Sequence, residues 1–466
     1  MKFINRKREL EFLEGAYASK RAELIIIYGR RRVGKTELLL HFAKGKPYVY
    51  YQASETSEKE NLHGIFERLG EHFGEDTGRY QETWENLFAY LPEKKERLVF
   101  IIDEFPYLIA QNGSISSIFQ KGWDGQLKNS NIMLVLNGSS VSMMEQHTLL
   151  YKAPLYGRRT GQWKVEPMAF GEMPKFFPGY SMRELIEAYG AVDTIPAYLA
   201  KFDPTLDVWG NVGQKLLSKG TFLYDEADFL LKQEFREPRV YKNCLTAIAR
   251  GHTKFSEIAS SANAEQSKIA IYLDTLASLG IIEKRSPLLD PANSKRGRYH
   301  LKDNFFKFYF RYSLPNRSSL EEGKLGPVLA KIKADYPNYI GRQVFENVCK
   351  QYLQAIGAQL PFEYEKLGGQ WGTFTRNKET NAYEIDIVAV NEANREILFS
   401  ECKWSDDVDA RAVLEELKGK TAHVKWHNDK REEHFAIFAR SFRRKEEIEE
   451  NVKLFDLKDL ERVFRH

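Results

Sequence analysis

Short runs of consecutive apolar residues mark the first third of the chain. Residues 24–28 read LIIIY, residues 98–103 read LVFIID and residues 132–136 read IMLVL. Unbroken runs of this length are typical of parallel strands that helices cover on both faces. The stretch ELLLHFA, which follows the first run, has helical character. The pattern therefore predicts an α/β domain with a buried parallel sheet.

From residue 238 onward the pattern changes to short helices followed by two strands. The expected elements are residues 240–251, 255–262, 265–280, 281–289 and 297–303. Three helices and a β-hairpin form the plan of a winged helix-turn-helix. Such folds contact DNA or bind other proteins, and the sequence leaves both uses open. In the proposed wing, Lys295, Arg296 and Arg298 would contact phosphates.

The last third of the chain combines helices with a β-hairpin. The segment DNFFKFYFRYS, residues 303–313, is apolar on nearly every face, which predicts a buried inter-domain helix. Residues 335–357 read as one long amphipathic helix that contains Glu346. A strand is expected at residues 371–376. Residues 383–404 then read as two apolar strands around the polar turn NEANRE.

Length and charge limit the classes of protein. A chain of 466 residues is too long for one core and predicts about three or four domains. The net charge is only +4, so any basic surface must be local. The three cysteines have no CxxC spacing, which argues against a zinc site or a disulfide framework. The sequence shows no signal peptide and no apolar run of the roughly 18 residues that span a bilayer, so a cytoplasmic protein is expected.

The loop GRRRVGKT after the first apolar run carries phosphate-binding chemistry. It fits GxxxxGK[ST], and strand, loop and helix follow in the required order. The glycines let backbone N–H groups wrap phosphates at a helix N-terminus. Lys35 would reach the β- and γ-phosphates of ATP, and Thr36 would ligate Mg²⁺. The predicted nucleotide-binding residues are Gly29, Arg30, Arg31, Arg32, Val33, Gly34, Lys35, Thr36 and Glu37.

Polar residues end the next two predicted strands. Asp103 would hold Mg²⁺, and Glu104 would polarise the attacking water as a general base. At the end of the third strand, Asn137 would sense the γ-phosphate or orient water. Arg158 or Arg159 would act as an arginine finger, in cis or from a neighbouring subunit. The alternative is that both arginines are ordinary surface residues.

Five segments together resemble the archaeal-type ATPase family, whose members are P-loop proteins close to the AAA+ and STAND groups. The segments are FINRKRELEFL, GRRRVGKT, IIDEFPYL, LNGSS and PLYGRRTGQW. The resemblance is strong over residues 1–230 and continues through a C-terminal region that often accompanies this ATPase. It implies ATP, Mg²⁺ and a RecA-like core followed by a small helical lid. It also places Asn5 and Arg6 near the nucleotide.

Charged residues interrupt the apolar strands of YEIDIVAVNEANREILFSECKW, residues 383–404. A symmetric NEANRE turn pairs Val390 with Ile397 and places Asp386 opposite Glu401. Because side chains alternate along strands, one end of one face is expected to hold Glu384, Asp386, Glu401 and Lys403. The opposite face is expected to hold Tyr383, Ile385 and Ile387.

Two facing carboxylates repel each other unless a cation lies between them. Asp386 and Glu401 therefore predict a site for Mg²⁺ or Mn²⁺, beside which Lys403 would orient water and stabilise phosphate charge. The arrangement resembles the PD-(D/E)xK nuclease superfamily. Asp386 matches the first strand acid, Glu401-Cys402-Lys403 matches the ExK strand, and Glu346 matches the acid of the preceding helix. The proline that often precedes the first acid is absent.

The chain is interpreted as a multidomain α/β protein. The expected parts are a RecA-like P-loop ATPase core (1–165), a helical lid (166–232), a winged helix-turn-helix (233–315) and a restriction-endonuclease-like domain (316–466). The leading hypothesis is an ATPase that acts on DNA through a C-terminal nuclease. The alternatives are an inactive nucleic-acid-binding domain, a structural ion cluster, a nucleotide-dependent switch, and a chaperone-like or defence-signalling ATPase with a protein partner. A homo-oligomer is expected if the arginine finger acts in trans.

Overall fold

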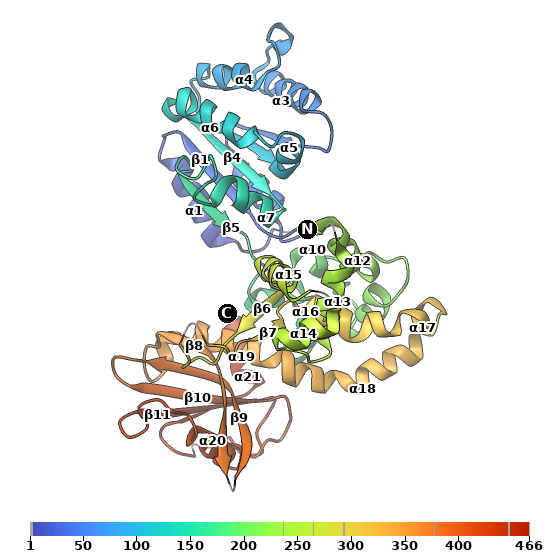
Figure 1. Ribbon diagram of the computed structural model, residues 1–466, viewed down its shortest axis with the longest axis vertical. Coiled ribbons are helices and arrows are strands. Elements are labelled where there is room, and N and C mark those ends of the chain that lie inside the picture. Colours follow the sequence, from blue (N-terminus) through green and yellow to red (C-terminus); the bar gives the residue numbers. More distant parts are fainter. Residues whose placement is uncertain are drawn as a thin grey trace. The chain divides into compact units, whose positions relative to one another are not determined.

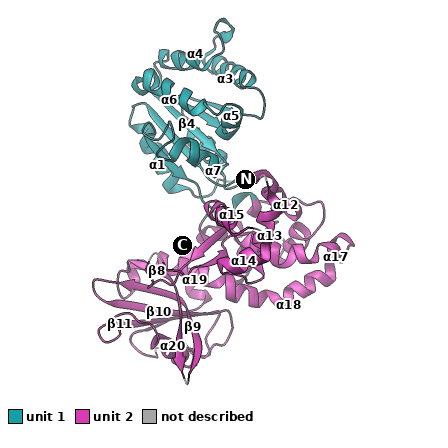
Figure 2. Ribbon diagram, in the orientation of Figure 1, with its two compact units in different colours: residues 1–168, 195–197 teal, residues 169–194, 198–466 magenta. Residues whose placement is uncertain are grey.

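The computed structural model describes residues 3–235, 237–263, 265–291, 294–376, 378–445 and 448–465. The chain divides into two compact units (Figures 1 and 2). Unit 1 comprises residues 1–168 and 195–197, and unit 2 comprises residues 169–194 and 198–466. None of the helices in the described ranges has the length and apolar character needed to cross a lipid bilayer.

Unit 1 is built on a five-stranded parallel sheet in the order β2-β3-β4-β1-β5 (Figure 1). The strands are β1 Glu23–Tyr28, β2 Tyr48–Gln52, β3 Leu98–Asp103, β4 Ile132–Gly138 and β5 Gly161–Lys164. Every residue of β3 and β4 is buried, as expected for unbroken apolar runs that helices cover on both faces. The predicted parallel α/β core is confirmed.

Helices of unit 1 pack on this sheet. They are α1 Lys7–Ala18, α2 Lys35–Ala43, α3 Glu58–Phe73, α4 Trp84–Tyr90, α5 Phe105–Gln111, α6 Ile115–Gly125 and α7 Val141–Met144. Leu13 of α1 and Leu38 of α2 join one buried cluster with Ile25 and Val135 of the sheet. This packing holds the start of α2 at the carboxyl end of β1, which is where a phosphate-binding loop must lie.

Unit 2 begins with short helices that pack against a later part of the chain. These are α8 Met173–Phe176, α9 Met182–Val192, α11 Val208–Asn211 and α12 Phe222–Glu234, with α10 Pro196–Leu199 at the unit boundary. The Ser181–Glu184 capping box starts α9. The hydroxyl of Tyr339 donates to the Gly190 carbonyl at 2.6 Å, and a Cβ at Gly190 would meet Ile340 at 2.5 Å. The small residue therefore permits close helix packing.

Three helices and a two-stranded sheet follow. They are α13 Pro238–Ala249, α14 Phe255–Ala262, α15 Gln266–Ser278, β6 Ile282–Arg285 and β7 Arg298–Leu301. The strands are antiparallel, with Ile282 opposite Leu301. In α15, Ile269, Leu273 and Leu276 are buried at helical spacing, so one face of this helix packs inward. Residues 292 and 293 of the expected loop lie outside the described residues.

The helices after the hairpin are α16 Asn304–Phe308, α17 Arg317–Glu321, α18 Leu325–Gln343 and α19 Phe345–Ala355. Between α16 and α17 the residues Tyr309–Ser313 form a π-helical turn, and this apolar segment is buried as predicted. The prediction of one helix over 335–357 is wrong. Val344 leaves the helical conformation at φ −121°. After this break the ring of the buried Phe345 packs against Trp404, with 5.0 Å between the two ring centres.

The last part of unit 2 is a five-stranded sheet in the order β12-β11-β10-β9-β8. Its strands are β8 Lys366–Arg376, β9 Glu379–Asn391, β10 Glu396–Lys403, β11 Glu432–Ala439 and β12 Val452–Phe455, with helices α20 Ala410–Thr421 and α21 Leu457–Phe464. β9 pairs antiparallel with β8 and β10, whereas β10, β11 and β12 run parallel. Val390 pairs with Ile397, which confirms the predicted register of the turn.

An irregularity in β9 alters the predicted faces of that strand. Val388 pairs with Gly368 while Ile385 pairs with Gln370, so β9 carries one extra residue at this point. An extra residue reverses the alternation of side chains. Ile385 therefore packs in the same buried cluster as Val388 instead of on the opposite face. The irregular step is a β-bulge, and Asp386 lies within it. For the residues of β9 before the bulge, the predicted faces are wrong.

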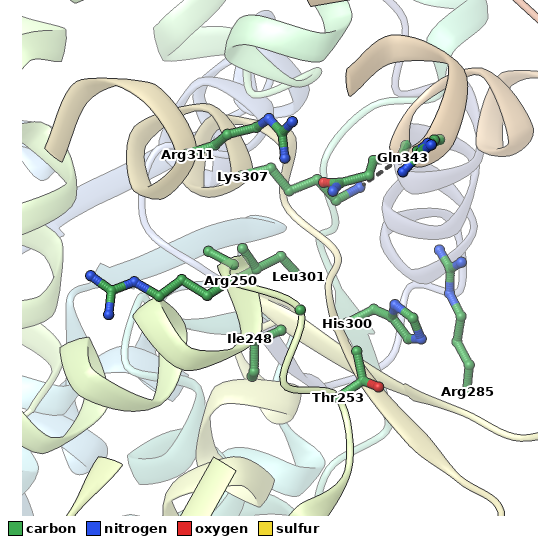
Figure 3. A pocket seen from close by; sticks show the side chains of 12 residues that line it. Ile248, Arg250, Thr253, Arg285, His300, Leu301, Lys307, Arg311 and Gln343 are labelled. Carbon is green, nitrogen blue, oxygen red and sulfur yellow. Dashed lines mark hydrogen bonds between the residues drawn. The ribbon is translucent and has the colours of Figure 1, made fainter. Parts of the chain in front are cut away.

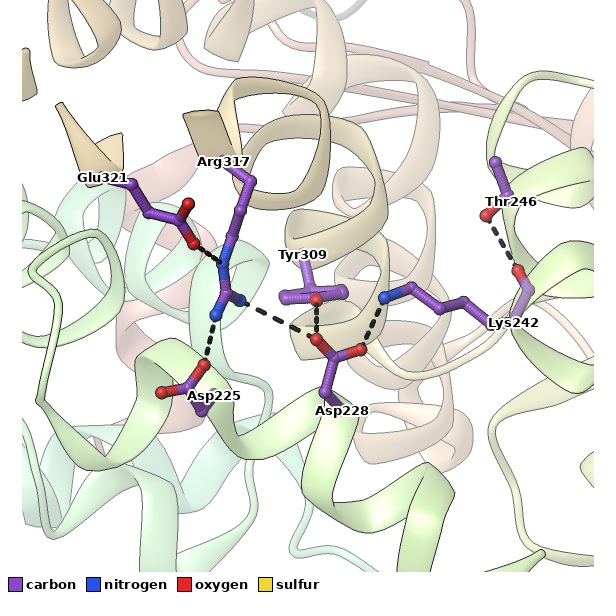
Figure 4. Close-up of polar contacts among 7 residues, drawn as sticks. All are labelled: Asp225, Asp228, Lys242, Thr246, Tyr309, Arg317 and Glu321. Carbon is purple, nitrogen blue, oxygen red and sulfur yellow. Dashed lines mark hydrogen bonds and ion pairs between the residues drawn. The ribbon is translucent and has the colours of Figure 1, made fainter. Parts of the chain in front are cut away.

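A polar network ties α12 to three later segments of unit 2 (Figure 4). Asp228 accepts a hydrogen bond from Lys242 at 2.7 Å and another from the Tyr309 hydroxyl at 2.8 Å. Arg317 lies 3.8 Å from Asp228 and pairs with Asp225. Tyr309 is buried, and burial together with Asp228 raises its pKa. The network thus connects α12, α13, the π-helical turn and α17.

We expect Asp228→Ala to destabilise unit 2 by about 1–3 kcal/mol, because it leaves the buried Tyr309 hydroxyl without its partner. Urea unfolding followed by circular dichroism measures the change. Glu321→Gln is the matched control, since Glu321 pairs with the same Arg317 from an exposed position. Its effect should stay within about 0.5 kcal/mol. Equal effects of the two variants would show that the network does not stabilise the fold.

Candidate functional site

The loop between β1 and α2 has a backbone that its glycines permit. Gly29 adopts φ 150°, and a Cβ at this position would meet the Val165 carbonyl oxygen at 2.2 Å. Gly34 adopts φ 89° directly before the first residue of α2. Larger residues would clash at the first position and be strained at the second. The loop therefore presents backbone N–H groups at a helix N-terminus, which is a favourable environment for phosphate.

Lys35 is buried within this loop. Its exposed fraction is 6%, and its Nζ donates to the Arg30 carbonyl oxygen at 3.1 Å. Val33 is buried in the core of the sheet, Arg30 is buried, and Glu37 is exposed on α2. Arg31 and Arg32 are partly exposed. The loop thus holds one buried ammonium where backbone N–H groups also gather.

Arg6, which the family resemblance places near the nucleotide, contacts the loop directly. Its guanidinium donates to the Val33 carbonyl at 2.7 Å and to the Glu166 carbonyl at 2.8 Å, and it pairs with Glu9 at 2.9 Å. Asn5 and Arg6 both adopt positive φ, 55° and 72°. The N-terminal segment is therefore fixed to the phosphate-binding loop.

Asp103 joins several elements at the carboxyl end of the sheet. The side chain is 2% exposed and accepts hydrogen bonds from Thr36 Oγ1 at 2.7 Å and from the Tyr50 hydroxyl at 2.8 Å. Asn137 also donates to it. Burial and Asp103 raise the pKa of Tyr50. Sequence reasoning missed Tyr50, although a tyrosine near the end of a strand beside β3 is a signal that could have identified it.

Glu104 points to a different partner from Asp103. It follows β3 at φ 53°, a left-handed conformation that costs a non-glycine residue on the order of 1 kcal/mol. Its carboxylate accepts from the Ser139 hydroxyl at 2.7 and 2.8 Å. Asp103 therefore contacts Thr36, whereas Glu104 contacts Ser139, the residue that follows β4.

Arg158 and Arg159 are both held within unit 1. Arg158 pairs with Asp124 at 3.0 Å. Arg159 donates to the Tyr156 carbonyl at 2.8 Å, and its guanidinium lies 4.6 Å from the centre of the Tyr156 ring. To act as an arginine finger, either side chain would have to leave these contacts and bind the nucleotide instead.

A second cluster lies where β9 and β10 separate. Glu401 is 5% exposed, and its Oε1 accepts from Lys403 at 3.0 Å and from Lys420 at 2.9 Å. Among the described residues its other oxygen, Oε2, is buried without a hydrogen-bond partner. Asp386 accepts from the Cys402 backbone N–H at 2.7 Å. Sequence reasoning missed Lys420, because this residue reaches the site from α20, a helix that follows the hairpin and is not part of it.

Burial and neighbouring acids perturb the carboxyl groups of this cluster. Burial, then Glu401 and Glu346, raise the pKa of Asp386 to about 8. Burial also raises the pKa of Glu346, which lies 3.6 Å from Arg285. The structure therefore brings Asp386, Glu401 and Glu346 within electrostatic reach of one another.

Glu384 does not join the cluster as predicted. The β9–β10 ladder ends at Ile387 and Ser400, so Glu384 has no position opposite Lys403. The side chain of Glu384 is exposed instead and lies 3.9 Å from Arg298. The irregularity in β9 and the separation of the two strands explain the difference, because the symmetric register does not continue beyond it.

The remaining acids fit a hard divalent cation. Buried carboxylates require a positive partner, and oxygen donors are the ligands that Mg²⁺ and Mn²⁺ prefer. Lys403 and Lys420 compensate one oxygen of Glu401, Oε2 has no hydrogen-bond partner among the described residues, and Asp386 accepts one backbone N–H. The donor types suit such an ion, but among the described residues these acids do not converge as Glu396, Glu432 and His434 do, whose ligand atoms lie within 4.8 Å of one another.

Comparison with known proteins identifies two family matches. Residues 3–202 match an ATPase domain found predominantly in archaea. Residues 309–437 match a family of archaeal and bacterial proteins of unknown function. The second match covers α18, α19 and most of the last sheet.

Individual relatives extend the similarity over the whole chain. An uncharacterized protein of Methanocaldococcus jannaschii is 38% identical over 462 residues, which cover 98% of this chain and 99% of that protein. An uncharacterized ATP-binding protein of the same organism is 59% identical over 44 residues, 9% of this chain and 75% of that protein. A Walker-type ATPase of Pyrococcus abyssi with a solved structure is 21% identical at a TM-score of 0.49, covering 66% of this chain and 96% of that chain.

The raised pKa of Asp386 predicts a pH-dependent stability. Its pKa is about 8 in the folded chain against an ordinary 3.8, so the folded state retains a proton that the unfolded state has lost. Stability contributed by this group therefore falls as pH rises from about 4 to 8. In a chelating buffer, Asp386→Asn should raise Tm relative to wild type at pH 8.5 and much less at pH 5.

Thermal unfolding at both pH values measures this difference. Glu379→Gln is the control, because Glu379 is an exposed carboxylate of the same strand. A gain in Tm from Asp386→Asn that is the same at pH 5 and pH 8.5 would show that Asp386 is ionised in the folded chain.

Proposed function

This chain belongs with the uncharacterized Methanocaldococcus jannaschii protein to a family that carries an ATPase domain found predominantly in archaea, and from that premise we propose that ATP turnover in unit 1 controls DNA cleavage by unit 2. The ATPase domain of the family lies at residues 3–202. The acid cluster of the last sheet would perform the cleavage. The single observation that supports this second role is the buried Oε2 of Glu401, which has no hydrogen-bond partner in the part of the chain that the structure describes, in the cluster with Asp386 and Lys403.

In unit 1 each polar side chain has a role that its contacts support. The loop N–H groups and Lys35 would bind the β- and γ-phosphates, and Thr36 with Asp103 would hold Mg²⁺. When bound, Mg²⁺ neutralises charge on the phosphates. Glu104, fixed by Ser139, would take the proton of the attacking water. Asn137 would keep Asp103 oriented toward Thr36.

In unit 2 the proposed chemistry is hydrolysis of a phosphodiester. Asp386, Glu401 and Glu346 would hold a divalent cation, which supplies Lewis-acid polarisation when bound. Lys403 would donate to the scissile phosphate, and Lys420 would keep Glu401 in place. Because Asp386 binds a proton near neutral pH, cation binding would release that proton.

The winged-helix-like region would bring DNA to this cluster. Its wing contacts the last sheet, since Arg296 donates to the Trp371 carbonyl and the Arg298 guanidinium lies 5.2 Å from the Trp371 ring centre. These arginines therefore link the two parts, and the exposed Lys295 would be available for phosphate.

A binding switch without cleavage is the second candidate function. The pairing of Arg285 with Glu346 at 3.6 Å favours it, because that pairing already neutralises one of the three acids. In this alternative, nucleotide state changes how the chain binds DNA or a protein, and the last sheet performs no chemistry. Absence of divalent-cation binding to the Asp386 cluster would support the switch.

For the ATPase, Lys35→Ala should abolish nucleotide binding, because it removes the one ammonium within the loop. Glu104→Gln should retain ATP binding and lower the hydrolysis rate by about 100-fold or more, since the base is lost. Phosphate release and nucleotide binding measure the two effects. Glu85→Gln is the control, because Glu85 is an exposed carboxylate on α4 of the same unit. Wild-type turnover in Glu104→Gln would rule out Glu104 as the base.

For the nuclease, Asp386→Ala should abolish Mn²⁺-dependent cleavage of DNA and Lys403→Ala should reduce it by about 100-fold. Gel analysis of a labelled duplex and a labelled single strand gives the rates. The control is Glu379→Gln, an exposed acid on the strand that carries Asp386. Cleavage by both alanine variants at the wild-type rate would assign the activity to a contaminant or to another site.

A further inference from the structure

Unit 2 contains a cavity of about 320 Å³ whose lining includes none of the acids of the cluster (Figure 3). It lies among the end of α13, the β6–β7 hairpin, the segment 307–311 and the end of α18. In the view of Figure 3, Lys307 and Gln343 lie on one side, with Ile248 and Thr253 on the other. The volume is at the lower end of the range for pockets that hold small molecules.

The lining of this cavity is strongly cationic. Its charged residues are Arg250, Arg285, Lys307, Arg311 and Arg342. No aspartate or glutamate occurs among the described residues that line it. His300 also lines the cavity, and burial with Arg285 lowers its pKa to about 4. The imidazole is therefore neutral and able to accept or donate a hydrogen bond.

Lys307 is the most deeply placed of these cations. It is 5% exposed, and its ammonium donates to Asn304 Oδ1 and to the Gln343 carbonyl, both at 2.9 Å. Both acceptors are neutral, and an ammonium has three N–H donors. Burial and the neighbouring Arg285 lower the pKa of Lys307 to about 8. Asp193, Glu283 and Glu346 act on this pKa in the opposite direction, but the two groups that accept hydrogen bonds from the ammonium are neutral.

The other cations differ in how far carboxylates compensate them. Arg285 pairs with Glu283 at 2.7 Å, and Arg311 pairs with Asp335 at 2.7 Å. Arg250 and Arg342 are exposed at the rim, and in the part of the chain that the structure describes neither forms an ion pair. The residues that line the cavity therefore carry net positive charge, while the acids that pair with Arg285 and Arg311 lie outside the lining.

We propose that this cavity binds a phosphomonoester, either a nucleoside monophosphate or the 5′-phosphate end of a nucleic-acid strand. A phosphate dianion offers oxygen acceptors to several donors at once, and guanidinium groups bind it in bidentate fashion. Ile248 and Leu301 provide an apolar wall against which a nucleoside would lie. The site is separate from the loop of unit 1, where Lys35 would bind the phosphates of ATP.

Isothermal titration of the full chain tests the proposal. The Lys35→Ala background is used so that the loop of unit 1 does not contribute. The probes are inorganic phosphate, AMP, and one oligonucleotide with either a 5′-phosphate or a 5′-hydroxyl end. We expect binding of AMP or a preference for the 5′-phosphate end, and the comparison distinguishes a free nucleotide from a strand terminus.

Variants assign the binding to the cavity. Arg250→Gln with Arg342→Gln changes only exposed rim side chains, so the fold should be preserved, and the affinity should fall about tenfold or more. Lys307→Gln should abolish binding if the protein still unfolds cooperatively. Arg239→Gln is the control, since Arg239 is exposed on α13, the helix that Arg250 directly follows. Absence of binding by every probe, or equal affinity in the rim double variant, would overturn the proposal.

Discussion

The buried carboxylate of Asp103 is the interaction on which the nucleotide site depends. It accepts hydrogen bonds from Thr36 at the start of α2, Tyr50 of β2 and Asn137 of β4. One side chain therefore joins three strands of the sheet to the helix that follows the phosphate-binding loop. Burying a carboxylate that is 2% exposed costs free energy unless the group is fully hydrogen-bonded. The side chains that donate to Asp103 are therefore needed as much as Asp103 itself.

Buried acids impose a similar constraint on the last sheet, but there they are not fully satisfied. Glu401 has two lysines on one oxygen and no partner on the other among the described residues. Arg285 pairs with Glu346 from the neighbouring hairpin and also lines the cationic cavity. A single guanidinium therefore contacts an acid of the last sheet's cluster and also lines the cationic cavity.

Local pattern was sufficient to predict the parallel sheet, the glycine loop and the pairing of Val390 with Ile397, because apolar runs and turn symmetry are properties of adjacent residues. The extra residue of β9 could not be predicted, because the unbroken apolar run 387–390 hides the reversal of alternation that the bulge causes. Lys420 and Arg285 were missed for a different reason, because each reaches the acids from an element distant in sequence. Long-range contacts of this kind follow from packing and not from periodicity.

The proposed link between ATP turnover and DNA cleavage can be tested by one comparison. The rate of Mn²⁺-dependent DNA cleavage by the full chain is measured with and without ATP, in wild type and in Lys35→Ala. The account predicts that ATP changes the wild-type rate several-fold and leaves the rate of Lys35→Ala unchanged. Cleavage that is insensitive to ATP in both proteins would contradict the link, and no cleavage under any condition would contradict the nuclease.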